Sequence, residues 1–94
     1  MNNYCKYENI DENIQNLEHI KAIFKKYLDG KYDIEDLIGT LEPQVYPDEI
    51  DDEYYDLIND IDRIIYRSDE YEQVLKLSKK FDSIVEEYIK KYHS

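Results

Sequence analysis

The carboxylates are the side chains of this sequence with the most capacity for chemistry, and they gather in one short stretch. Residues 46–62 carry eight Asp or Glu and no Lys or Arg, in a chain of 94 residues with a formal net charge of −11. Paired carboxylates can cleave glycosides, but one of them must then have its pKa raised by burial in a cleft. An EF-hand calcium loop needs a central glycine, and no glycine follows Gly39. We therefore expect neither a hydrolase site nor a metal site in this stretch.

Histidine and cysteine, which supply many nucleophiles and metal ligands, are nearly absent. His19 falls beside the apolar stripe of a helix, where a hydrogen-bonded structural role is expected, and His93 lies in the C-terminal end. Cys5 is expected to be a passive thiol, because nothing near it in the sequence would lower its pKa. Gly-rich phosphate loops, zinc-binding Cys pairs, His-Glu-x-x-His and nucleophile elbows are missing. The sequence predicts a protein that is not an enzyme and has no metal or organic cofactor.

The composition favours a small all-α protein. Hydrophobic residues make up 41% and charged residues 37%, which is enough apolar material for one folded core. Only two Gly and two Pro occur, too few for the many turns of a β-sandwich or barrel. The start of the chain lacks a secretory signal, and no apolar run approaches the ~20 residues that span a bilayer. We expect a single domain over 1–94, located in the cytoplasm and not attached to a membrane.

Four segments repeat apolar residues at spacings of three and four, the period of an amphipathic helix. They predict helices at about 11–29, 34–41, 49–66 and 69–92. Their ends are marked by expected N-caps and one expected C-cap, namely Asp11, Asp33, Asp48, Ser68 or Asp69, and Gly30. Short connections between such helices predict an antiparallel bundle of three to four helices. Whether the short helix at 34–41 is a full member is left open.

The fourth helix has the clearest core stripe. Its expected inward residues are Tyr71, Val74, Leu75, Ser78, Phe81, Val85, Tyr88 and Tyr92. Phe81 lies in the middle of this stripe and is expected at the centre of the core.

The third helix combines a core stripe with the acidic stretch. On a helical wheel one flank holds Glu49, Asp52, Glu53, Asp56 and Asp60, and the other holds Asp51, Tyr55, Asn59 and Asp62. A surface that serves only solubility usually mixes both charge signs, and this one does not. Eleven of the 13 aromatic residues are Tyr, a residue type favoured at interfaces, and Tyr46 and Tyr55 are expected to be exposed. The predicted partner-binding residues are Tyr46, Glu49, Asp51, Asp52, Glu53, Tyr55, Asp56 and Asp60.

A basic protein is the natural partner for such a face, because opposite charges attract and direct binding to nucleic acid needs Lys and Arg instead. The segment 24–58 also resembles a known family. Its runs Phe24–Lys31, Asp33–Leu37 and Glu49–Glu53 are similar to those of the immunity proteins of colicin D-like toxins. The resemblance implies a small acidic helical protein that binds a ribonuclease toxin and blocks its tRNA-binding cleft.

Two other functions are compatible with the sequence. A phage-type anti-defence protein, or another nucleic-acid mimic, would use the same carboxylates against a DNA-binding target. A structural helical adaptor would use apolar surface instead. The oligomeric state is left open.

Overall fold

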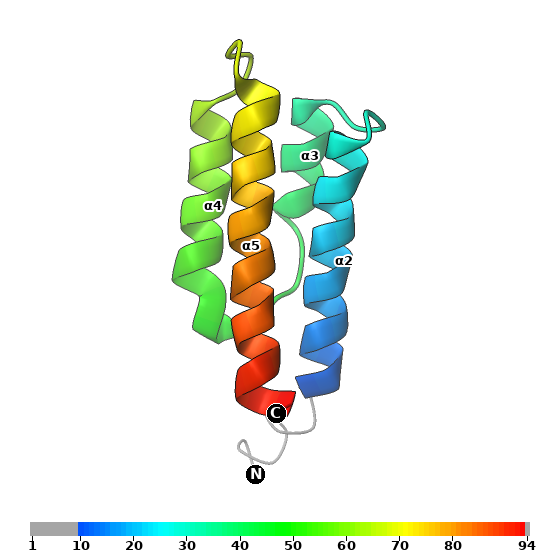
Figure 1. Ribbon diagram of the computed structural model, residues 1–94, viewed down its shortest axis with the longest axis vertical. Coiled ribbons are helices and arrows are strands. Elements are labelled where there is room, and N and C mark those ends of the chain that lie inside the picture. Colours follow the sequence, from blue (N-terminus) through cyan, green and yellow to red (C-terminus); the bar gives the residue numbers. More distant parts are fainter. Residues whose placement is uncertain (1–9, 94) are drawn as a thin grey trace.

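Four α-helices and one short 3-10 turn make up the described part of the chain. The structure is a computed structural model that describes residues 10–93. In chain order its elements are α2 (Ile10–Leu28), α3 (Ile34–Leu41), η1 (Asp48–Ile50), α4 (Asp51–Arg63) and α5 (Glu70–His93). Successive helices run in opposite directions, and α5 extends along the bundle between α2 and α4 (Figure 1). The prediction of a small all-α antiparallel bundle is confirmed.

The connection between α2 and α3 follows the sequence signals closely. Gly30 has a φ of 85°, and its N–H donates to the Tyr27 carbonyl at 3.0 Å. The Lys31 N–H donates to the Lys26 carbonyl at 2.8 Å, which completes a Schellman motif. Asp33 then begins α3 with a capping box, in which its side chain accepts from the Asp36 N–H at 2.8 Å. The expected caps Gly30 and Asp33 are both confirmed.

Two expected N-caps are wrong. Because α2 already begins at Ile10, Asp11 lies inside its first turn. There the positive end of the helix dipole stabilises its carboxylate. Asp48 is the first residue of η1, which is preceded by the extended Pro47, and no side chain caps that turn. The α-helix proper begins only at Asp51. Proline fixes its own φ near −65°, so the chain turns directly from Pro47 into η1.

The third helix ends earlier than expected, at Arg63 instead of residue 66. No Gly or Pro marks this end, and the chain turns instead at Tyr66, whose φ of 62° is unusual for a bulky residue. Two glutamates hold Tyr66 in this conformation. Its N–H donates to the Glu70 carboxylate at 2.7 Å, and its hydroxyl donates to the Glu35 carboxylate of α3. Helix α5 then starts at Glu70, one residue after the expected start.

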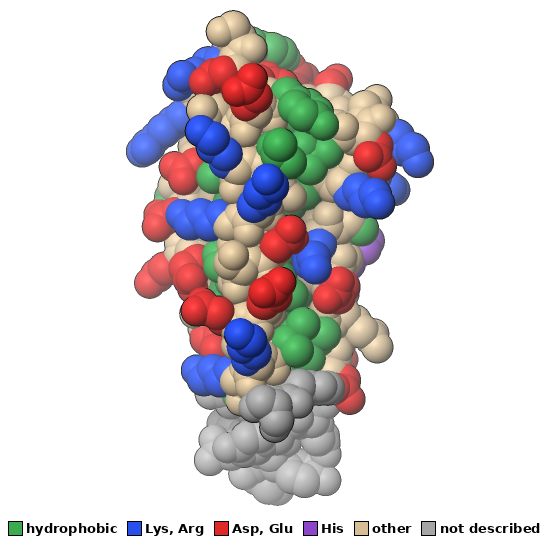
Figure 2. All heavy atoms as spheres, viewed as in Figure 1, with side chains coloured by type: hydrophobic (Ala, Val, Ile, Leu, Met, Phe, Trp, Pro, Cys, Tyr) green, Lys and Arg blue, Asp and Glu red, His purple; other side chains and the backbone are tan. Residues whose placement is uncertain are grey.

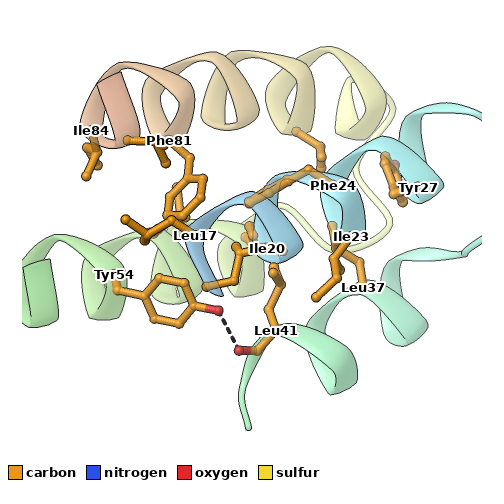
Figure 3. Packing of buried hydrophobic residues seen from close by; sticks show 14 of the residues in the cluster. Leu17, Ile20, Ile23, Phe24, Tyr27, Leu37, Leu41, Tyr54, Phe81 and Ile84 are labelled. Atoms are coloured by element: carbon orange, nitrogen blue, oxygen red, sulfur yellow. Dashed lines mark hydrogen bonds between the residues drawn. The ribbon is translucent and has the colours of Figure 1, made fainter. Parts of the chain in front are cut away.

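The core lies between the four helices, and each of them contributes buried side chains (Figure 3). The Phe24 and Phe81 rings lie 5.9 Å apart, and Tyr54 meets Phe81 edge to face at 6.2 Å. Helix α3 supplies Ile34, Leu37 and Leu41, all of them buried. The short helix is therefore a full member of the bundle.

Part of the expected core stripe of α5 is wrong. Tyr71 is 51% exposed, and Leu75 is half-buried outside the group of apolar residues that packs against the core. Ile84, which was not expected inside, is buried. Successive helical residues are about 100° apart, so Leu75 falls to one side of the stripe that runs through Val74 and Phe81. The rest of the stripe, including Phe81 at the centre, is confirmed, with Ser78 and Tyr92 only half-buried.

Candidate protein-binding site on helix α4

Three of the predicted site residues form a free acidic group on the outer side of α4. Asp52, Glu53 and Asp56 are exposed, and none of their carboxylates makes a hydrogen bond or ion pair with any residue from 10 to 93. They lie within about one turn of helix, which places residues four apart about 5–6 Å from each other between Cβ atoms. Such carboxylates repel one another and remain available to an external cation.

The other predicted carboxylates already have partners within the fold. The two oxygens of Glu49 accept from Lys91 Nζ at 3.3 Å and from the Tyr92 hydroxyl at 2.5 Å. Asp60 forms an ion pair with Arg63 at 3.9 Å. The predicted set therefore divides into a free group and a partnered group. Glu49 serves mainly to join η1 to the end of α5.

The two tyrosines of the predicted site differ in exposure. Tyr55 is 66% exposed, as expected, and lies next to the free carboxylates along α4. Tyr46 is half-buried, with its ring 4.2 Å from the Tyr54 ring, so the expectation that it is exposed is wrong. Its hydroxyl donates to Asp51 at 2.7 Å, and this bond, followed by burial, raises the pKa of Tyr46. Both Tyr46 and Asp51 are thus committed to holding the loop before α4.

Lysines of α5 lie close to the acidic flank of α4. Figure 2 shows acidic side chains over α4 with Lys and Arg side chains beside them. The hydrogen bond to Glu49 is the main cause that raises the pKa of Lys91. The acidic face therefore ends at α5, and its free part is narrower than the helical wheel indicated.

A groove between the start of α4 and the end of α5 was missed by the sequence reasoning. It is open to solvent and has a volume of about 500 Å³. Its lining residues are Glu49, Ile50, Glu53, Ile84, Glu87, Tyr88, Lys90 and Lys91. The only sequence signal was the apolar period of the two helices. That period does not show that residues 42 positions apart, such as Glu49 and Lys91, meet.

The residues considered for catalysis and metal binding add little to this site. His19 is exposed on α2, and Cys5 lies outside the described residues. Among residues 10–93, no group of three or more His, Cys, Asp or Glu is arranged to hold a metal ion. None of the described helices is long and apolar enough to cross a membrane.

Comparison of the chain with known protein families, curated proteins and solved structures gives no match. What the site does must be inferred from its own chemistry.

Proposed function

We propose that this protein is an acidic inhibitor of the immunity type, which binds a basic toxin, a nuclease of the tRNA-cleaving kind, and occludes its nucleic-acid-binding cleft. The observation that carries the proposal is the free acidic group Asp52, Glu53 and Asp56, which has no cation of its own among residues 10–93. The exposed Tyr55 ring beside it supplies contact area. The proposal also agrees with the resemblance of residues 24–58 to colicin D-like immunity proteins.

Physical chemistry supports an acidic helix as an inhibitor of a nuclease. A cleft that binds phosphates is basic, so carboxylates can occupy it and exclude the substrate. Complementary charge also speeds the encounter of the two proteins, toward about 10⁸–10⁹ M⁻¹s⁻¹ at low salt. No reaction is required of the inhibitor, and the cytoplasm is the compartment in which it would protect tRNA.

Two alternatives use different parts of the same structure. A nucleic-acid mimic of the phage anti-defence type would present the same free carboxylates to a DNA-binding target. A structural adaptor would use apolar surface such as Tyr71, which is 51% exposed. The identity of the captured partner distinguishes the nucleic-acid mimic from the proposed inhibitor. The charge dependence of binding distinguishes the structural adaptor from it.

The test has two stages. The tagged chain is first used to capture its partner from the native host, and the partner is identified by mass spectrometry. Affinity is then measured for the double variant Asp52→Lys and Asp56→Lys. We expect binding to weaken by roughly 2–5 kcal/mol, because attraction to a basic cleft becomes repulsion.

The matched control is Glu72→Lys with Glu86→Lys, which changes the net charge equally at exposed positions of α5. It should weaken binding far less, and both double variants should keep the circular dichroism spectrum of the wild type. If the α4 variant binds as tightly as wild type across a salt titration, the acidic face only maintains solubility and the proposal is wrong. A captured partner that is a DNA-binding protein would favour the mimic.

A further inference from the structure

The groove between α4 and α5 has an apolar floor. Ile50 and Tyr88 are each 4% exposed and Ile84 is 8% exposed, so all three are packed into the fold while still lining the groove. Ile50 comes from η1, and the other two come from α5. An extended methylene chain would find hydrocarbon contact along this floor.

Charged side chains form the rim of the groove. Glu49 and Lys91 are already paired with each other at 3.3 Å, and the Lys91 ammonium also lies 5.4 Å from the centre of the Tyr92 ring. The carboxylates of Glu53 and Glu87 make no hydrogen bond or ion pair with any residue from 10 to 93. With the Glu49 pair set aside, two carboxylates and the single cation Lys90 remain on the rim. Their net charge is negative and adds to that of Asp52 and Asp56 on the neighbouring turns.

We propose that this groove receives one basic side chain of the partner, arginine or lysine, with its methylene stem on Ile50, Ile84 and Tyr88 and its cationic head at Glu53 and Glu87. A wholly acidic surface would attract cations without orienting them. An apolar floor with carboxylates at its edge suits a long side chain that is hydrocarbon along its length and charged at its end. The Lys91 ammonium held by Glu49 shows that this rim already stabilises a cation within the chain itself.

The inference rests on the proposed function only for the source of the side chain, so it can be tested without the partner. The probe is Nα-acetyl-arginine amide, titrated into the ¹⁵N-labelled full chain and followed by amide chemical shifts. We expect shifts confined to residues 49–53 and 84–91, with a Kd on the order of 10 mM for so small a ligand. The neutral isostere Nα-acetyl-citrulline amide should cause no such shifts.

Variants sharpen the test in both directions. Glu53→Gln with Glu87→Gln should weaken binding of the probe about fivefold. Lys91→Gln should tighten it about twofold to fivefold, because Glu49 then loses its internal cation. The charge-matched control Asp52→Asn with Asp56→Asn lies outside the groove lining and should change the Kd by less than about twofold. For each variant, the amide spectrum away from the groove verifies the fold.

Three results would overturn the groove proposal: equal binding of the citrulline amide, unchanged binding in the Glu53 and Glu87 variant, or shifts spread evenly along α4. These results are distinguishable from failure of the proposed function. If the groove fails while Asp52→Lys with Asp56→Lys still disrupts partner binding, the inhibitor role stands without this anchor. If the groove binds the arginine amide while Asp52→Lys with Asp56→Lys keeps full partner affinity, the proposed acidic interface is wrong.

Discussion

The Tyr54 hydroxyl donates a 2.5 Å hydrogen bond to the Leu41 carbonyl, which joins the buried side of α4 to the last turn of α3 (Figure 3). The same carbonyl accepts a longer bond from the Gln44 N–H at 3.3 Å. The last four carbonyls of any α-helix have no partner inside the helix, and Leu41 is the last residue of α3. Its C-terminal end is therefore held by a side chain from a neighbouring helix as well as by its own turn.

Replacing Tyr54 by Phe should lower the free energy of unfolding by about 1 kcal/mol, since one buried hydrogen bond is lost while the Leu41 carbonyl keeps the Gln44 N–H. Urea denaturation followed by circular dichroism measures the change. Tyr55→Phe removes a hydroxyl from an exposed ring and should have almost no effect. Equal losses in the two variants would mean that the Tyr54 bond contributes nothing.

The position of Phe81 gives a second prediction. It is fully buried between Phe24 and Tyr54, so Phe81→Ala should cost roughly 3–5 kcal/mol. Leu75→Ala should cost less than about 1 kcal/mol, because Leu75 is half-buried and away from the core cluster. Thermal or urea unfolding of both variants tests the pair. If Leu75→Ala loses as much stability as Phe81→Ala, Leu75 lies in the core, as the sequence predicted.

The two ends of the bundle's connections show which parts of this fold could be predicted: the α2–α3 connection could, and the end of α4 could not. Helix existence followed from apolar spacing, and the α2–α3 connection followed from Gly30 and Asp33, whose signals act locally. The end of α4 could not be predicted, since Tyr66 adopts a left-handed conformation held by Glu35 and Glu70 from other elements. Local signals predicted local structure, and tertiary contacts determined the remainder.

The two glycines should respond to alanine in opposite ways. Gly30→Ala should destabilise by about 1 kcal/mol, because a φ of 85° is strained for any residue with a Cβ. Gly39→Ala should stabilise by about 0.5–1 kcal/mol, since Gly39 lies inside α3 and an added Cβ meets nothing within 4 Å. Denaturant unfolding of the two variants measures both signs. A loss of stability in the Gly39 variant would contradict the placement of α3.

Stability should depend on alkaline pH through two tyrosines. Burial raises the pKa of both Tyr27 and Tyr54 above the ordinary value near 10, and Tyr27 also donates to Glu70 at 2.6 Å. Because both folded-state pKa values are raised, this contribution is fully present below about pH 10 and is lost as pH rises beyond it. Urea unfolding at a series of pH values should show the free energy of unfolding falling above pH 10. The tyrosinate absorbance of the folded protein should appear at a higher pH than that of the unfolded chain. Tyr27→Phe should reduce the slope, and a slope unchanged in that variant would contradict its burial.

The candidate site was predicted in outline and corrected in detail. Charge counting found the acidic stretch, and the helical period found its outward side, because both depend only on nearby residues. Neither could show that Glu49 is bound by Lys91 and Tyr92, or that Tyr46 turns inward against Tyr54. Those contacts arise only when distant segments pack. They reduce the free surface to Asp52, Glu53 and Asp56 with Tyr55 beside them.

The role of Tyr55 separates contact area from charge at this surface. Tyr55→Ala should weaken binding of the captured partner by about 1–2 kcal/mol, as expected for an exposed ring buried at an interface, and leave the salt dependence of affinity nearly unchanged. Asp56→Asn should instead reduce the salt dependence, because screening acts on charge. Titration calorimetry at several salt concentrations measures both effects.

Tyr71→Ala is the matched control, since Tyr71 is an exposed tyrosine on α5 whose hydroxyl donates to the Leu28 carbonyl of α2 at 3.0 Å. If Tyr71→Ala loses affinity while Tyr55→Ala keeps it, the partner binds apolar surface near α2 and α5, as an adaptor would.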